Sequence, residues 1–123
     1  MEHNSNFRYD LKRGQEAEEW FAGLLTGGDT IECKRDFKAH KTGNVYVEFE
    51  SRGKPSGIRR TEAEHWAFVY GPNELDLRVV VISAKRLKAL AEAAIAEDRW
   101  KPGGDSNTSK GAIIPLEGLV TGD

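Results

Sequence analysis

Two segments of this chain alternate apolar and charged residues with the period of two that is typical of β-strands. This alternation constrains the fold more than any other feature, because it sets which side chains share a sheet face. In residues 30–36 (TIECKRD) the charged positions of one parity are Glu32, Lys34 and Asp36. In residues 45–50 (VYVEFE) they are Glu48 and Glu50. We therefore predict two strands, each with a charged face.

The residues between the two segments favour a hairpin. Thr42-Gly43-Asn44 has turn chemistry. A hairpin centred near residue 41 places Glu32 and Lys34 on the same face as Glu48 and Glu50, within cross-strand reach. The opposite face carries Cys33, which we expect to be a buried, inert thiol.

Helical spacing predicts three helices, over residues 11–25, 61–70 and 85–100. Thr61 and Glu64 form a capping box at the start of the second helix. Residues 75–83 (LDLRVVVIS) resemble a central strand that is buried on both faces. The segment 112–120 (AIIPLEGLV) either adds a strand or packs on the surface. This order predicts a mixed α/β fold.

Length and composition favour a single domain. The chain has 123 residues, of which 38% are hydrophobic, and this suffices for one modest core. We divide it into a loose arm (1–10), a core (11–100), and a loop with a C-terminal segment (101–123). The sequence shows no apolar run of membrane-span length and no signal-peptide pattern, so we expect a cytoplasmic protein without a membrane partner. One cysteine and three scattered histidines give no disulfide or zinc spacing.

The net charge of −2 hides a basic middle segment. Residues 32–60 carry eight Lys or Arg against four Asp or Glu, a local excess of four positive charges. Clustered cations of this kind contact phosphates, although they also serve as solubilising loop surface. Contact with DNA is our interpretation for this segment. The candidate DNA-binding residues are Lys38, Lys41, Arg52, Lys54, Arg59 and Arg60.

The acidic face has the residue types of a phosphodiester-hydrolysing site. Such a site needs carboxylates a few ångström apart that hold Mg²⁺ or Mn²⁺, together with a cation that orients water or stabilises charge. Here the chain resembles the PD-(D/E)XK nuclease superfamily, and within it small phage-type endonucleases and resolvase-like proteins. The resemblance rests on Glu32-Cys33-Lys34 as the ExK element and on the element order across residues 11–97. The run from Gly14 to Glu18 looks like the GxxxE element of the first helix in resolvase-like members.

The resemblance implies a restriction-endonuclease-like core, in which helices flank a small mixed sheet. It implies a Mg²⁺- or Mn²⁺-dependent DNA endonuclease of a bacterial or phage-infected cell, acting on branched or phage DNA. Glu32 and Glu48 would be metal ligands, with Asp36 as a further candidate. Lys34 would orient water or stabilise charge, and Glu18 would be an auxiliary acid.

Several alternatives stay open. Glu32 fits either the ExK element or the lone-acid position, and in the second case Glu48-Phe49-Glu50 occupies the ExK position as an ExE variant. The same acidic face also occurs in an ordinary solvated sheet with Glu–Lys pairs, but we favour the metal site, because three carboxylates beside one lysine repel one another without a cation. A non-catalytic DNA-binding or interaction module that keeps a nuclease-like fold is the competing function. A homodimer would suit the cutting of two strands.

Overall fold

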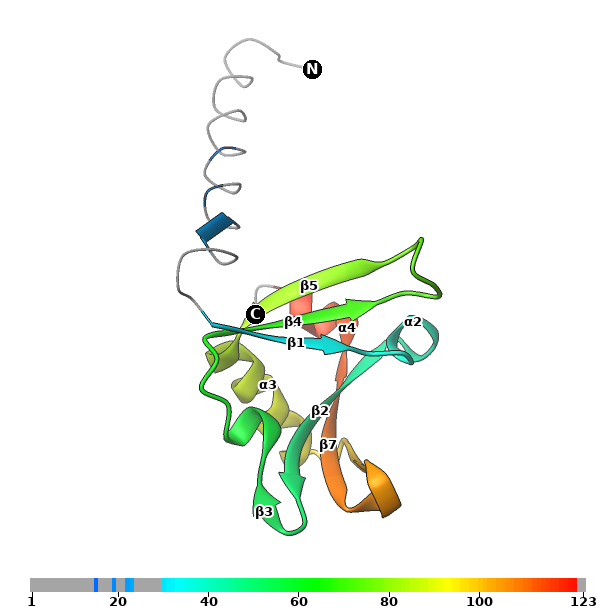
Figure 1. Cartoon of the computed structure of the whole chain (residues 1–123). Helices are drawn as coiled ribbons and strands as arrows, with labels where there is room; N and C mark the ends of the chain where they lie inside the picture. Colours follow the sequence, from blue (N-terminus) through cyan, green and yellow to red (C-terminus); the bar gives the residue numbers. More distant parts are fainter. Residues whose placement is uncertain (1–14, 16–18, 20–21, 24–29, 122–123) are drawn as a thin grey trace. The chain divides into compact units, whose positions relative to one another are not determined.

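The computed structural model describes residues 15, 19, 22–23 and 30–121 (Figure 1). The chain divides into two compact units, Met1–Thr30 and Ile31–Asp123. In the first unit the described residues Gln15, Glu19, Ala22 and Gly23 are helical and exposed, in agreement with the helix expected over residues 11–25. Glu18 and the loose arm lie outside the described residues.

The second unit contains a three-stranded sheet with the order β1, β4, β5. Its strands are β1 (Ile31–Arg35), β4 (His65–Tyr70) and β5 (Arg78–Ser83). β1 runs parallel to β4, and β4 runs antiparallel to β5. β1 places Glu32 beside Trp66 and Lys34 beside Phe68. Since neighbouring side chains share a face, Glu32 and Lys34 lie on the sheet face that carries these buried aromatic rings.

The other sheet has four antiparallel strands in the order β3, β2, β7, β6. They are β3 (Lys54–Pro55), β2 (Asn44–Ser51), β7 (Ser109–Pro115) and β6 (Trp100–Gly103). The helices are α2 (Ala39–Thr42), α3 (Ala84–Ala96) and α4 (Leu116–Val120), with short 3₁₀ turns η1 (Gly57–Arg59) and η2 (Asp105–Asn107). In Figure 1 the two sheets cross, with β1, β4 and β5 running across the view and β2 and β7 running down it.

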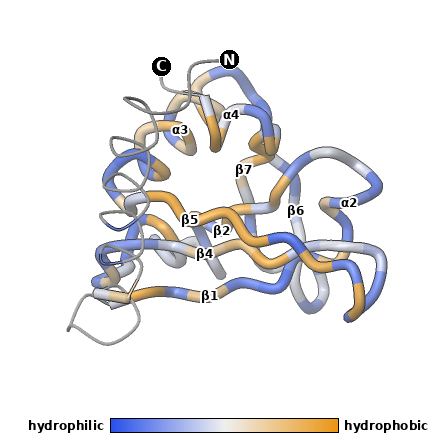
Figure 2. The backbone as a smooth tube through the Cα atoms, turned by 90° about the horizontal axis from the view of Figure 1, so that it is seen from above, coloured by the Kyte–Doolittle hydropathy of each residue, from blue (hydrophilic) through white to orange (hydrophobic). Residues whose placement is uncertain are grey.

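The core lies between α3 and the inner faces of both sheets. α3 packs on β7, and its buried face consists of Leu87, Ala91 and Ala94. The residues of β2 alternate as the sequence predicts, with Val45, Val47 and Phe49 buried. Trp66, Phe68 and Ile82 contribute the inner face of the other sheet. In Figure 2 the hydrophobic colour covers much of β5.

The mixed α/β class is therefore confirmed, but the predicted hairpin is wrong. β1 pairs with β4, and β2 pairs with β7, so the two charged strands belong to different sheets. The reason lies in residues 36–43. Instead of a tight turn, the chain forms α2 there, which ends at Gly43 in the left-handed conformation (φ 75°) and redirects the chain into the second sheet.

The helix predicted over residues 61–70 is also wrong, because His65–Tyr70 form β4. The segment HWAFVY is rich in aromatic and β-branched residues, which suit a strand. Apolar residues of both parities are buried in it, so helical and strand spacing could not be told apart. The Thr61 hydroxyl does not cap a helix. It accepts hydrogen bonds from the Ala63 amide (3.1 Å) and the Trp66 indole (3.2 Å).

Four smaller predictions are confirmed only in part or are wrong. The strand expected at 75–83 is present as β5, but it is an edge strand and Val79 is 56% exposed, so its central position is wrong. Cys33 is exposed, because its parity on β1 points away from the core face. The helix expected over 85–100 is present but ends at Ala96. The C-terminal segment adds a strand, β7, to the interior of the four-stranded sheet.

Candidate functional site

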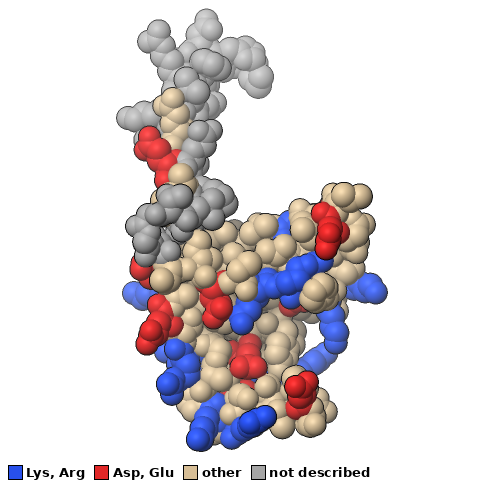
Figure 3. Space-filling model, viewed as in Figure 1, with Lys and Arg blue, Asp and Glu red and all other residues tan. Residues whose placement is uncertain are grey.

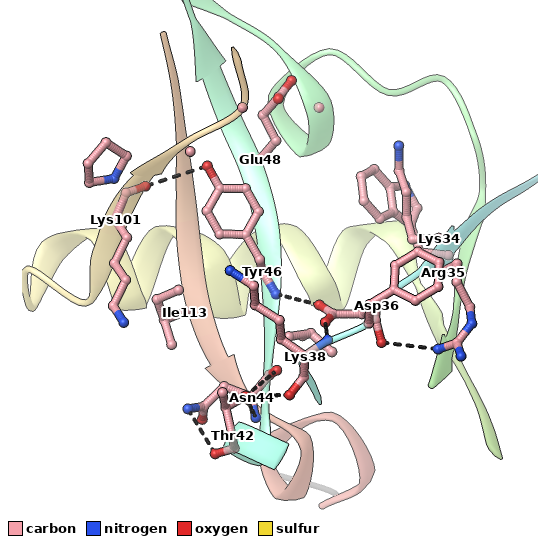
Figure 4. A pocket seen from close by; sticks show the side chains of 17 residues that line it. Lys34, Arg35, Asp36, Lys38, Thr42, Asn44, Tyr46, Glu48, Lys101 and Ile113 are labelled. Carbon is pink, nitrogen blue, oxygen red and sulfur yellow. Dashed lines mark hydrogen bonds between the residues drawn. The ribbon is translucent and has the colours of Figure 1, made fainter. Parts of the chain in front are cut away.

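An open cavity of about 570 Å³ lies where the end of β1, the β1–α2 connection, β2 and β6 meet (Figure 4). Its chemically active lining residues come from all four segments. They are Lys34, Arg35, Asp36, Lys38, Tyr46, Glu48 and Lys101. The cavity thus combines residues of both sheets, and the two charged strands of the sequence meet here although they do not pair.

Asp36 anchors the cavity wall. Its Oδ1 accepts hydrogen bonds from the amides of Lys38 (3.0 Å) and Ala39 (2.9 Å), and its Oδ2 accepts one from the amide of Tyr46 (3.1 Å). The carboxylate therefore holds the turn that leads into α2, and it joins this turn to β2. Both oxygens already have backbone partners, so the structure gives Asp36 an architectural role.

Glu48 is half-buried on β2 and lines the cavity. The 3₁₀ turn η1 approaches its backbone at Gly57, where a Cβ atom would come within 2.1 Å of the Glu48 carbonyl oxygen. Gly57 also has φ +53°, a conformation that side chains other than hydrogen disfavour. Only glycine fits here. The loop of residues 51–60, which carries four Lys or Arg residues and is called the basic loop below, is thereby held against the cavity wall.

A β-bulge separates Glu48 from Glu50. Glu48 pairs with Gly111, whereas Glu50 pairs with the next residue of β7, Lys110, so β2 contains one extra residue between them. Glu48 and Glu50 therefore point to opposite faces of the sheet. Glu50 forms an ion pair with Lys110 (Oε2 to Nζ, 3.2 Å), whose ammonium lies 5.0 Å from the ring centroid of Trp100. The acidic face expected from the sequence thus loses Glu50.

Tyr46 lies flat on the four-stranded sheet. Cβ atoms added at Gly111 and Gly103 would come within 2.2 Å of its Cζ and 2.5 Å of its Oη, respectively, so the ring covers both glycines. Its hydroxyl donates a hydrogen bond to the Lys101 carbonyl (3.5 Å). Burial raises the pKa of the Tyr46 phenol above its ordinary value, and the nearby Glu48 carboxylate raises it further. The phenol is therefore a neutral hydrogen-bond donor at physiological pH.

Cations outnumber carboxylates around the cavity. Lys34, Arg35, Lys38 and Lys101 line it together with only two carboxylates. The Lys34 ammonium lies 5.5 Å from the ring centroid of Trp66 and is exposed on the other side. Because Asp36 is held by backbone amides, Glu48 is the main acidic group offered to a ligand. The electrostatic balance favours an anion such as a phosphate.

Most of the other predicted site residues do not line this cavity. Glu32 shares the β1 face of Lys34 and is half-buried, but it does not line the cavity. Arg59 is held in an ion pair with Glu92 of α3. Figure 3 shows basic side chains spread over the viewed face with acidic ones between them. The exposed members of the predicted DNA-binding set are Lys38, Lys41, Arg52, Lys54 and Arg60.

A divalent cation fits this site only in part. In the described portion of the chain, no group of three or more His, Cys, Asp or Glu residues is arranged to hold a metal. Mg²⁺, however, keeps several waters and commonly uses one or two carboxylates together with substrate phosphates. Glu48 supplies a carboxylate of this kind beside the cations that would bring a phosphate. The donor set therefore fits a cation that arrives with its substrate.

Sequence reasoning missed Tyr46 and Lys101 as cavity residues. The alternation of β2 places Tyr46 on the parity of Glu48, and this signal would have identified it. Lys101 has no such signal, because it reaches the cavity only through the pairing of β6 with β7.

Comparison of the chain with protein-family models, with curated proteins and with solved structures found no match. Of the helices in the described residues, none is both long and apolar enough to cross a membrane.

Proposed function

We propose that this chain is a divalent-metal-dependent DNA endonuclease that hydrolyses phosphodiester bonds in its cationic cavity. One observation carries the proposal. Lys34 and Glu48, which come from different sheets, line the same open cavity. This pair supports the proposal, since the carboxylate can hold a metal ion and the lysine can stabilise the charge that develops on a bound phosphate.

Four charged cavity residues would have a role in this reaction. Glu48 would hold Mg²⁺ or Mn²⁺ together with a substrate phosphate. The metal, when bound, would polarise the phosphate and acidify a water molecule. The Lys34 ammonium would stabilise the negative charge that develops on the phosphoryl oxygens. Lys38 and Lys101 would hold phosphates on either side of the scissile bond.

The test is incubation of the protein with branched, single-stranded and duplex DNA in Mg²⁺ or Mn²⁺. We expect cleavage that EDTA abolishes and that Glu48→Gln removes. Glu50→Gln is the matched control, because Glu50 lies two residues away but faces the opposite side of the sheet and should keep activity. If none of the three substrates is cleaved, the proposed endonuclease activity is rejected.

The arrangement of the carboxylates favours a second function, that of a non-catalytic DNA-binding module. Asp36 is already held by three backbone amides, and no three-residue metal group forms among residues 30–121. A non-catalytic DNA-binding module would need only the cations. Calorimetric titration of the protein–oligonucleotide complex with Mn²⁺ separates the two functions. The endonuclease complex should release or absorb heat that Glu48→Gln abolishes, and the complex of the module should give no more heat than the oligonucleotide alone.

A further inference from the structure

We propose that Tyr46 is a stacking platform for an unpaired nucleobase, so that the cavity acts on single-stranded or locally unpaired nucleic acid. The inference rests on the proposed DNA-directed function of the same cavity and names its substrate. It starts from the position of one aromatic ring on a sheet surface.

Glycines determine how the Tyr46 ring lies. Tyr46 and Glu48 lie on the face of β2 opposite to that of the buried Val45 and Val47. On the neighbouring strands, β7 offers Gly111 and β6 offers Gly103. Any side chain at Gly111 would overlap the ring, since a Cβ there would lie within 2.4 Å of both Cε atoms and 2.2 Å of Cζ. The ring therefore lies flat across β7 toward β6, and the Lys101 carbonyl holds its hydroxyl there.

The second face of the ring is available to a ligand. Tyr46 lines the cavity, and its first face is covered by the glycines, so its other face points into the open space. Figure 4 shows the ring with Lys101 on one side and Lys34 on the other. A flat aromatic face between cations matches the needs of a nucleotide, whose base stacks while its phosphates contact lysines.

The arrangement favours single strands over duplex DNA. In a duplex both faces of each base are covered by its neighbours, so a protein ring gains access only after the base leaves the stack. An unpaired base presents its face without that cost. Stacking contributes about 5-fold to 150-fold in affinity per base and tolerates any base.

Phe37 is the competing aromatic residue in this cavity. It is 71% exposed and lines the rim, but the guanidinium of Arg35 lies 4.5 Å from its ring centroid. One Phe37 face is thus covered by a cation, and no sheet supports the ring. Tyr46 is held by backbone on one side and by a hydrogen bond at its hydroxyl, so it is the better preorganised platform.

The first experiment measures binding in EDTA, so that it does not depend on cleavage. Affinities are compared for an oligothymidylate, an abasic oligonucleotide of the same length, and the duplex. We expect the oligothymidylate to bind at least about fivefold more tightly than the abasic strand. Tyr46→Leu should remove this difference and leave abasic binding unchanged, whereas Tyr46→Phe should retain it. Equal binding of both strands by the wild-type protein would overturn the inference.

A second experiment requires no substitution and is therefore unaffected by misfolding. Photocrosslinking of an oligonucleotide that carries 5-iodouracil, followed by peptide mapping, should label Tyr46. A crosslink at Phe37 alone would reject Tyr46 as the platform. Failure of the cleavage assay with preserved base-dependent binding would reject the endonuclease and leave the stacking site standing.

Discussion

The guanidinium of Arg59 donates two hydrogen bonds to the carboxylate of Glu92, from Nε at 2.9 Å and from Nη2 at 2.8 Å. The same guanidinium lies 4.8 Å from the ring centroid of Phe49. The two hydrogen bonds connect η1 to α3. They also occupy the guanidinium of Arg59, which therefore does not belong to the exposed cations of the basic loop. The loop next to the cavity is consequently fixed at its η1 end.

Replacing Glu92 by Gln should destabilise the fold by about 1 kcal/mol at neutral pH, near the upper end for exposed ion pairs, because the contact is bidentate. The hydrogen bond from Arg59 lowers the pKa of Glu92 below its ordinary value of 4.5. The pair therefore stabilises the fold above the unfolded-state pKa and loses this effect as the pH falls through the lower, folded-state pKa.

Urea denaturation of the wild type and of Glu92→Gln at neutral and acidic pH measures this effect. The two stabilities should converge in acid. Glu97→Gln, in a more exposed pair with Arg99, is the control and should cost less. A gap between wild type and Glu92→Gln that persists unchanged in acid would contradict the assigned pair.

Asp36→Asn should destabilise the fold by about 2 kcal/mol or more. The carboxylate accepts three backbone hydrogen bonds, and an amide offers only one acceptor atom, which leaves amides of α2 or β2 without a partner. Chemical denaturation measures the loss, with the exposed Asp105→Asn as the control. If stability were unchanged and only Mn²⁺ affinity fell, Asp36 would be a metal ligand, as the sequence suggested.

Lys34→Ala should separate chemistry from binding. Loss of a positioned charge at the scissile phosphate costs on the order of 10²-fold in rate, while DNA affinity is nearly kept because other cations remain. Single-turnover cleavage at saturating protein and equilibrium binding measure the two effects. Lys88→Ala, on the exposed side of α3, is the control. A loss of affinity at an unchanged saturated rate would make Lys34 a simple phosphate contact.

The exposed cations of the basic loop should control salt dependence. Neutralising Arg52, Lys54 and Arg60 should flatten the plot of log affinity against log salt by about one slope unit per lost phosphate contact. Arg59→Gln should act mainly on the stability of the fold rather than on this slope, because the Arg59 charge is paired with Glu92. Titrations at several salt concentrations supply both comparisons. An unchanged slope for the triple variant would show that DNA phosphates do not contact these three residues.

Gly111 and Tyr46 should be energetically coupled. Gly111→Ala forces the ring away from β7 and should cost about 1–3 kcal/mol, as overpacking does. In the Tyr46→Leu background the same substitution should cost less, because the ring atoms it meets are absent. A double-mutant cycle by denaturation measures the coupling, which should be about 0.5–3 kcal/mol. Additive effects would show that the ring does not rest on Gly111.

The sequence predicted the local character of the strands better than their partners. The buried parity of β2 was correct, because Val45, Val47 and Phe49 follow strand periodicity without interruption. The pairing of β1 was not legible, since a parallel strand contacts a partner far along the chain and no turn residue signals it. Residues 65–70 were assigned to the wrong class because apolar residues on both parities satisfy helical spacing as well.

The candidate site was predicted only in part, because the sequence shows the parity of a strand but not its partner. Lys34 and Glu48 were identified by type and parity, and both line the cavity. Glu50 was placed on their face because a strict period of two allows no bulge, and the extra residue of β2 became visible only through its pairing with β7. The sequence showed no sign of the three hydrogen bonds that Asp36 accepts from backbone amides, because they depend on the path of the chain around α2.

The parallel pairing of β1 with β4 has a consequence for folding kinetics. Residues 36–64, which include α2, β2, β3 and η1, separate the two strands, so this pair closes a long loop before its contacts form. The neighbouring β4–β5 hairpin closes a much shorter one. Within the three-stranded sheet, β1 should therefore join after the β4–β5 hairpin, and its amide hydrogens should gain exchange protection after those of β4 during refolding. Because β1 delivers Lys34, the cavity would be completed only after the β4–β5 hairpin has formed.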